Sequence, residues 1–374
     1  MIHPEQFITE MEKHWTHRLG NVSSQPLRDA WGQIATAFVD HIKAEESEEE
    51  KWTILQPPTG SGKSQGTAVY CGMLARHVPY EEQPGVLLVT RLISEANEMA
   101  RLINELGGDP EFAVAYHCES KQVTPIQTLN RYPVVVITHR AYELAMDHLQ
   151  ETDQEVTIQK TWPLFHEFGF DGSRKLVVID EALDIVEESM GELGGLKATL
   201  FWTEDALGKQ FPQEFKALRG LIAVLEELRD RGEATEAGHV SGTILAREFI
   251  LKLIEDGIPD FTAMRAALKR VRFDKVMLRK LRDDHLNSML RDDHDARLKS
   301  VGHILRAWAY YMKDGKYHIL NNARLLVPEG VKGAVVLDAT AAVNVVYQLF
   351  DKANVVQPPA GVRNYQNVTL HVST

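Results

Sequence analysis

Short apolar runs rich in β-branched residues alternate with helix-patterned stretches in the first half of the chain and again near its C-terminal end. The runs are apolar on both faces, which is typical of buried strands in a parallel sheet. Their alternation with helices predicts an α/β fold whose strands are joined by right-handed crossovers. The runs are residues 52–56 (WTILQ), 86–90 (VLLVT), 134–138 (VVVIT), 176–180 (LVVID) and 334–338 (AVVLD).

The segments around these strands follow other patterns. Residues 1–44 are predicted to be helical, because Trp31, Ile34 and Phe38 recur at helical spacing. The acidic run at residues 45–50 predicts a solvated loop.

The strand alternation stops between residues 185 and 315, where the sequence is charged and helix-patterned. We expect a mostly helical inserted subdomain there, with residues 1–184 and 316–374 forming one discontinuous sheet domain. A hairpin is expected just after the insertion, with Asn321 and Asn322 at its turn, because asparagine tolerates the positive φ of such turns.

Composition narrows the class of protein. A length of 374 residues suits two domains or one domain with an insertion. The N-terminus lacks a signal-peptide pattern, no apolar run is long enough to span a bilayer, and two cysteines exclude a disulfide framework, so we expect a cytoplasmic protein without a membrane partner. The net charge of −12 means that any surface binding nucleic acid must be local.

A glycine-rich turn, QPPTGSGKS at residues 56–64, directly follows the first predicted strand and precedes a helix-compatible stretch. Backbone N–H groups of such a loop cradle phosphate oxygens, and the helix N-terminus adds its positive dipole end. We therefore expect ATP at this loop, with Lys63 on the β- and γ-phosphates and Ser64 as a ligand of Mg²⁺. An incidental glycine-rich turn is the alternative. The predicted nucleotide-binding residues of the loop are Thr59, Gly60, Ser61, Gly62, Lys63 and Ser64.

The run LVVIDEALDIV ends a buried strand on Asp180. A carboxylate at the carboxyl end of a central strand lies at the ligand-binding edge of such a sheet. Asp180 is predicted to anchor Mg²⁺, and Glu181 to position and polarise the attacking water. An ordinary acidic cap between strand and helix is the alternative.

Five short segments resemble the motifs of superfamily 2 helicases, the DEAD/DEAH-like group, in order and context. Pro57, where a general P-loop has glycine, fits the helicase version of the first motif. Over about residues 30–345 the chain looks like the first RecA-like motor domain of that superfamily, an α/β P-loop NTPase. The segments are PPTGSGKS (57–64), VTR (89–91), THR (138–140), DEAL (180–183) and DAT (338–340).

The resemblance implies further roles. Gln33 matches the upstream glutamine that reads adenine, since its amide has both a donor and an acceptor. Asp338 and Thr340 match the motif that couples hydrolysis to movement, although Asp338 stands where serine is more usual. Nucleic-acid phosphates are expected along Thr90, Arg91, Thr138 and His139, for which plain strand-end polarity is the alternative.

A large insertion between motifs II and III is similar to the arrangement in the XPD and DinG helicases, which favours DNA over RNA. Their four cluster cysteines have no counterpart here, because the chain contains only Cys71 and Cys118. A superfamily 2 motor also needs a second RecA-like domain that supplies an arginine finger. We expect that domain in a longer form of this chain or in a partner chain.

Two patterns in the insertion remain open to two interpretations. Four basic residues at helical spacing are expected to lie on one helix face, where they contact a phosphate backbone or solvent. LRDDH occurs at residues 281–285 and 290–294, but a nine-residue offset on a helix turns the two copies to opposite sides, which disfavours a metal site. The basic residues are Lys269, Arg272, Lys275 and Arg279.

Together these features predict an ATP-dependent helicase or translocase, hydrolysing ATP with Mg²⁺ on nucleic acid. The alternative is a nucleotide-dependent switch or binding module that acts with a partner protein and turns over little ATP. A small-molecule kinase is disfavoured, since it would leave DEAL and DAT without a role.

Overall fold

The structure is a computed structural model whose described residues form two compact units. One comprises Met1–Ile185 with Leu326–Thr374, and the other Val186–Leu325. The second unit extends past residue 315, because the strand Tyr317–Leu325 pairs with the strand Val186–Glu192. The described residues are 1–44, 51–120, 124–151, 161–170, 172–182, 186–235, 244–245, 250, 252–253, 257–273, 284–306, 309–327, 330–344, 347 and 352–362.

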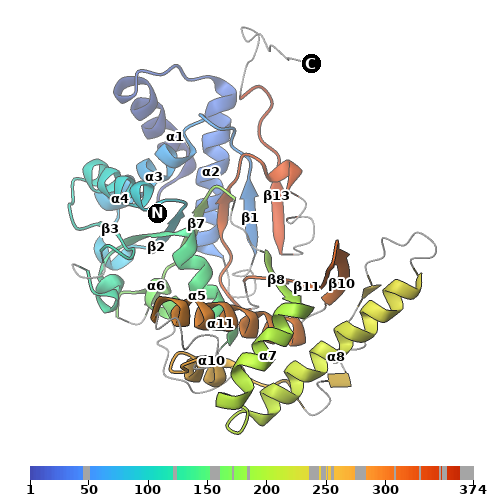
Figure 1. Cartoon of the computed structure of the whole chain (residues 1–374). Coiled ribbons are helices and arrows are strands. Elements are labelled where there is room, and N and C mark those ends of the chain that lie inside the picture. The colour runs from blue at the N-terminus through green and yellow to red at the C-terminus, as the bar shows by residue number, and fades with distance from the viewer. Residues whose placement is uncertain are drawn as a thin grey trace. The chain divides into compact units, whose positions relative to one another are not determined.

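A seven-stranded sheet forms the centre of the first unit (Figure 1). Its strand order is β13-β1-β12-β7-β2-β4-β3, and all neighbouring pairs are parallel. The predicted α/β fold is confirmed: the parallel sheet is flanked by helices, as in a RecA-like domain. The strands are β1 (Trp52–Leu55), β2 (Val86–Thr90), β3 (Ala113–Ala115), β4 (Val134–Thr138), β7 (Leu176–Asp180), β12 (Val335–Leu337) and β13 (Ala353–Val356).

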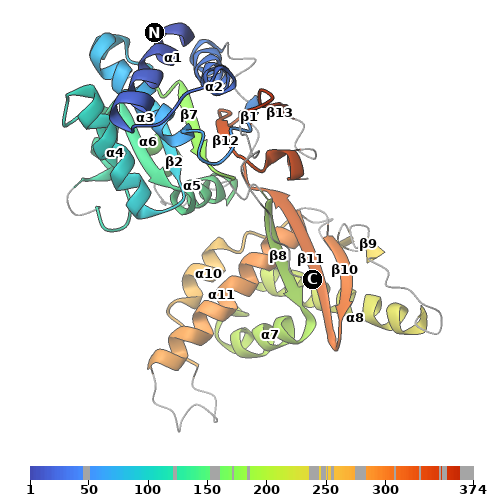
Figure 2. The same ribbon diagram turned by 90° about the horizontal axis from the view of Figure 1, so that it is seen from above.

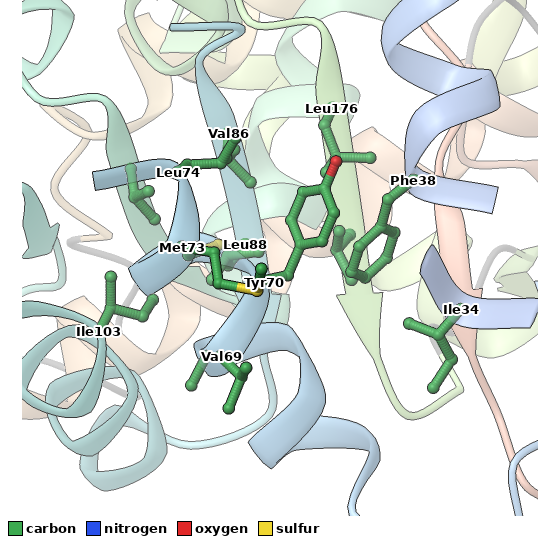
Figure 3. Close-up of a cluster of buried hydrophobic side chains, with 14 of the residues drawn as sticks. Ile34, Phe38, Val69, Tyr70, Met73, Leu74, Val86, Leu88, Ile103 and Leu176 are labelled. Atoms are coloured by element: carbon green, nitrogen blue, oxygen red, sulfur yellow. The ribbon is translucent and has the colours of Figure 1, made fainter. Parts of the chain in front are cut away.

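Alternate residues of each strand enter two different cores, which explains why the strands are apolar on both faces. In β2, Val86 and Leu88 join one core, and Leu87 and Val89 join the other. The first core is covered by four helices, and Figure 3 shows Tyr70 of one helix against Phe38 of another, with ring centroids 5.0 Å apart. The helices of the first core are α1 (Pro4–Lys13), α2 (Gln25–Lys43), α3 (Lys63–His77) and α4 (Ile93–Gly107), and those of the second are α5 (His139–Glu151) and α6 (Thr161–His166).

Short elements complete the first unit. A π-helical turn, His14–Arg18, continues α1, so the predicted helical N-terminal region is confirmed over residues 4–18 and 25–43. The predicted loop at residues 45–50 lies outside the described residues. The remaining elements are the 3₁₀ turns Tyr80–Glu82, Ile126–Arg131 and Ala341–Val343 and the strands β5 (Glu167–Phe168) and β6 (Gly172–Ser173).

The second unit combines helices with an antiparallel sheet of order β8-β11-β10-β9. Figure 2 shows β8, β11 and β10 side by side, with α7 and α11 beside them. Its core joins the described helices of this unit to Tyr311 and Leu320 of the sheet. The elements are β8 (Val186–Glu192), α7 (Leu193–Leu207), α8 (Pro212–Thr235), β9 (Ile244–Leu245), α10 (Thr262–Leu268), α11 (Asp284–Arg306), β10 (Ala309–Asp314) and β11 (Tyr317–Leu325).

The predicted hairpin exists, but the turn assignment was wrong. The turn lies at Gly315, where φ is +56°, and pairs Asp314 with Tyr317. Asn321 and Asn322 are inside β11, opposite Tyr310 and Ala309. Glycine adopts positive φ without a steric cost, so it takes the turn in preference to asparagine.

The predicted basic helix face is also not found in the described part of the insertion. Helix α10 ends at Leu268, and Lys269 is its C-cap residue. Arg272 lies in a stretch without regular secondary structure. Lys275 and Arg279 lie outside the described residues. Helical spacing therefore does not bring Lys269 and Arg272 onto one face, and their predicted contact with phosphates stays a prediction.

A buried arginine ties together the amino-terminal edge of the large sheet. Arg174 is fully buried and stacks on Phe168 with its guanidinium carbon 5.4 Å from the ring centroid. Its guanidinium donates to backbone carbonyls of three segments: the end of α6, the first residue of β2 and the residues before β4. The acceptors are the carbonyls of Phe165 (2.9 Å), Val86 (3.3 Å), Tyr132 (2.9 Å), Pro133 (2.9 Å) and Leu129 (2.8 Å).

We expect Arg174→Met to lower the free energy of unfolding by about 3 kcal/mol or more, because a buried carbonyl left without a donor costs about 1–3 kcal/mol. Urea unfolding followed by tryptophan fluorescence measures the change. The exposed Arg131 on the preceding turn provides the matched control, and Arg131→Met should stay within about 0.5 kcal/mol of the parent. Equal effects of the two substitutions would contradict a clamping role for Arg174.

Candidate functional site

The glycine-rich loop connects β1 to α3 and has the backbone shape that a phosphate cradle needs. Gly60 and Gly62 have φ of +82° and +81°, in the left-handed region that glycine adopts without strain. The Ser61 N–H donates to the Pro58 carbonyl at 3.0 Å, which closes the turn. Helix α3 begins at Lys63, so the N–H groups of its first turn, which lack helical partners, lie at the loop.

The N-terminal helices hold this loop from behind. A Cβ atom at Gly62 would lie 2.7 Å from Cζ3 of Trp15. The indole N–H of Trp31 donates to the Ser61 carbonyl at 2.8 Å, and the two tryptophan rings meet edge to face at 5.7 Å. The imidazole of His14 also lies 2.8 Å from Oε1 of Gln65. Glycine is therefore required at position 62 both by its φ and by the tryptophan ring.

The Asp180 carboxylate joins the loop to the end of β7. Its Oδ1 lies 3.1 Å from Nζ of Lys63, and its Oδ2 accepts from the Ser64 hydroxyl at 2.5 Å. The Lys63 and Asp180 side chains are only 12% and 19% exposed, so this ion pair is partly buried. Lys63 also donates to the Leu337 carbonyl at 3.0 Å, which connects the loop to β12.

The backbone at Glu181 is held in an uncommon conformation. Its φ is +68°, the positive-φ conformation that non-glycine residues rarely adopt. The Glu181 N–H donates to the Leu337 carbonyl at 3.3 Å, and Nε2 of His139 donates to the Asp180 carbonyl at 2.9 Å. These contacts fix the peptide groups on both sides of the turn. The Glu181 side chain itself is 51% exposed, 3.8 Å from the Arg91 guanidinium.

A cavity of about 190 Å³ opens in front of these groups. Its lining includes Ser64, Thr90, Asp180 and Glu181, together with Glu95 and Glu98 of α4. Hydroxyl and carboxylate oxygens are the ligands that Mg²⁺ prefers, and the pairing of Ser64 with Asp180 places two such donors together. These residues therefore fit the predicted metal ion.

Asp338 and Thr340 directly follow β12, which is the strand between β1 and β7. They therefore lie between the glycine-rich loop, which follows β1, and the acidic residues Asp180 and Glu181 at the end of β7. The Asp338 N–H donates to the Leu55 carbonyl at 3.0 Å, and its carboxylate accepts from the N–H and hydroxyl of Thr340 at 2.8 and 2.6 Å. Burial, reinforced by the nearby Asp338 carboxylate, raises the pKa of Tyr347 above its ordinary value. The segment is thus a closed turn adjacent to the Leu337 carbonyl.

The residues predicted to contact nucleic acid have different environments. Thr90 and Thr138 are buried, and the Thr138 hydroxyl accepts from the Ala141 N–H at 3.3 Å, as an N-terminal cap of α5. His139 contacts the Asp180 carbonyl, as described above. Arg91 is the exposed member of the group, at 69% of its side-chain surface.

Gln33 lies on α2 and donates from its amide to the Gln357 carbonyl at 3.1 Å. The neighbouring Val356 carbonyl accepts from Gln56, which begins the loop, at 3.2 Å. Gln33 is therefore connected to the loop through the end of β13, and its predicted contact with adenine stays a prediction.

Two parts of the site had no signal in the sequence. The Leu337 carbonyl belongs to an apolar strand, and Trp15 resembles any core aromatic. The contact of His139 with the Asp180 carbonyl was also not expected, and its predicted contact with nucleic acid stays a prediction. All three residues act through contacts between residues far apart in the chain.

No family model and no curated protein matches the chain. Among solved structures, the chain is similar to Xpd4 of S. tokodaii, with 12% identity and a TM-score of 0.38 over 88% of this chain. The match spans 60% of the Xpd4 chain, and a similarity this low transfers no function. None of the described helices is long and apolar enough to cross a membrane.

We expect Gly62→Ala to destabilise the protein more than Gly108→Ala does. Both glycines have positive φ, +81° and +73°, so both substitutions cost about 1 kcal/mol in backbone strain. Only at Gly62 does the added methyl meet side chains, those of Trp15 and Met11, whereas nothing lies within 4 Å at Gly108. The expected difference, about 1–3 kcal/mol, is measured by urea unfolding. Equal losses would show that the Trp15 and Met11 side chains move aside freely.

Proposed function

We propose that this chain binds ATP with Mg²⁺ and hydrolyses it, as the first RecA-like motor domain of a nucleic-acid helicase or translocase, with DNA favoured over RNA. The convergence of Lys63, Ser64 and Asp180 at the carboxyl edge of the parallel sheet carries this proposal. A glycine-rich loop, a lysine at a helix N-terminus and a strand-end carboxylate in contact are the parts that a P-loop NTPase needs.

Each side chain then has one task. Lys63 leaves Asp180 and binds the β- and γ-phosphates, which its flexible ammonium group reaches as a point charge. Ser64 and Asp180 hold the cation, which supplies charge neutralisation on the phosphate oxygens when bound. Glu181 accepts a proton from the attacking water, and its exposed carboxylate is accessible to that water.

A helicase-type motor also needs a cation on the far side of the γ-phosphate. An arginine finger in related enzymes contributes about 10³–10⁵ in rate. In this proposal that arginine comes from a second RecA-like domain, in the same polypeptide or in a partner chain. Closure of the two domains around ATP would provide the movement along nucleic acid.

We expect Lys63→Ala and Glu181→Gln to fail at different steps. Lys63→Ala removes a phosphate contact from ground and transition states, so ATP binding weakens and turnover falls by roughly 10²–10³-fold. Glu181→Gln keeps Mg²⁺-ATP binding and blocks turnover, because an amide does not accept the proton. Titration with a fluorescent ATP analogue and a steady-state ATPase assay separate the two effects. The exposed Lys43 supplies a control, Lys43→Ala, with parent behaviour.

The chain of 374 residues, assayed alone, should bind ATP weakly and hydrolyse it slowly, with or without single-stranded DNA. In this proposal Lys63, Ser64 and Asp180 contact the phosphates and the metal ion from one side, and the second domain supplies the arginine on the other side. A rise in turnover when a second RecA-like domain is added would support a motor that is completed by a partner. Rapid DNA-stimulated turnover by the purified monomer would contradict it. ATP-dependent binding of a partner without a rise in turnover would favour the nucleotide-dependent switch module.

A further inference from the structure

A second and larger pocket, of about 680 Å³, lies at the carboxyl ends of β2, β3 and β4. Its lining comes from the segments that follow these strands, such as Arg91–Ser94, Tyr116–Cys118 and the start of α5. All of these residues belong to the unit that contains the seven-stranded sheet. The volume falls within the range of about 300–1,000 Å³ that is typical of small-ligand sites.

The inside of this pocket is aromatic and aliphatic. Tyr116 and Phe165 are 6% and 3% exposed, and their rings meet edge to face with centroids 5.8 Å apart. Leu92 and Leu144 remain 52% and 38% exposed, which is unusual for large apolar side chains that line a concave surface. A flat apolar group would therefore gain contact area here.

The charged side chains that line the pocket are positive. The charged side chains in its lining are Arg91 and Arg140, and both are exposed, at 69% and 72%. They are paired with Glu181 and Glu143 at 3.8 and 3.1 Å, in ion pairs too exposed to hold the arginines firmly. A ligand that combines a flat apolar part with flanking negative charge complements this arrangement.

We propose that the pocket takes one unstacked base of a single-stranded nucleic acid, with the flanking phosphates on Arg91 and Arg140. Single strands are recognised in general by bases splayed out onto aromatic side chains and by cations along the backbone. The inference rests on the proposed function, since it names a subsite for the nucleic acid expected there. It adds a base-binding pocket to the predicted track of phosphate contacts, and Thr138 of that track also lines the pocket.

Cys118 provides a native probe, because it is exposed and lines the pocket. The only other cysteine, Cys71, is fully buried, and burial raises the pKa of its thiol to about 12. Alkylation of the whole chain by N-ethylmaleimide, followed by mass spectrometry, therefore reports on Cys118. Cys118→Ser should abolish the rapid labelling.

The ligands to compare are an oligothymidylate of about 12 nucleotides and the same backbone without bases. We expect the oligothymidylate to slow alkylation of Cys118 and the abasic strand to leave it unchanged. Fluorescence anisotropy should give a dissociation constant about tenfold lower for the oligothymidylate, which is the contribution of one stacked base. Equal protection by both strands would overturn the base pocket.

Filling the pocket tests the assignment directly. Leu144→Trp should abolish the tenfold preference for the oligothymidylate while keeping the affinity for the abasic strand, which also shows that the variant is folded. Leu19→Trp is the matched control, since Leu19 is equally exposed, at 39%, and does not line the pocket. If the preference for the oligothymidylate survives Leu144→Trp, the base pocket is contradicted, but nucleic-acid binding by the chain is not. Failure of the parent to bind either strand contradicts nucleic-acid binding as well.

Discussion

The carbonyl oxygen of Leu337 is the point on which the arrangement of the candidate nucleotide site depends. It accepts from the Lys63 ammonium at 3.0 Å and from the Glu181 N–H at 3.3 Å, so one acceptor joins the glycine-rich loop to the acidic turn. The next residue, Asp338, donates from its N–H to the Leu55 carbonyl at the end of β1. These contacts require β12 to lie between β1 and β7. The carboxyl ends of these strands therefore bring together residues that are far apart in the sequence.

The pairing of Lys63 with Asp180 determines how ligands can enter. Each charge is mostly buried, and removing the partner of a buried charge costs several kcal/mol, of the order of 3–5. A phosphate group arriving alone would take Lys63 and leave Asp180 unpaired, and a cation arriving alone would do the opposite. Under the proposed function, ATP and Mg²⁺ arriving together would replace both partners at once. We therefore expect the proposed site to bind the complex of ATP and Mg²⁺ in preference to either component.

Much of this site was predictable because its parts are local. A strand buried on both faces, a glycine-rich turn and a lysine at the next helix follow one another in residues 52–64, and Asp180 ends a similar strand. Strands β3 and β13 were not predicted, since Ala113–Ala115 and Ala353–Val356 are short and weakly apolar. The second unit shows more clearly where prediction from local sequence patterns fails. Helical spacing of basic residues continues past Leu268, but the helix ends there, and Val271 and Phe273 of the following stretch are buried in the core of the second unit.

Arg91 shows why the remaining contacts could not be read from the sequence. Its position after β2 predicted a role in binding phosphate, and its exposure agrees with a surface role, but its two neighbours come from elsewhere. One is Glu181, from the end of β7, and the other is the apolar pocket formed with Tyr116 and Leu144. An exposed ion pair of this kind contributes about 0–1 kcal/mol, so a phosphate competes for Arg91 at little cost. Under the two proposals, a phosphate bound at the pocket would release the Glu181 carboxylate from its ion pair with Arg91. Nucleic acid and ATP would then be linked through the Arg91 side chain.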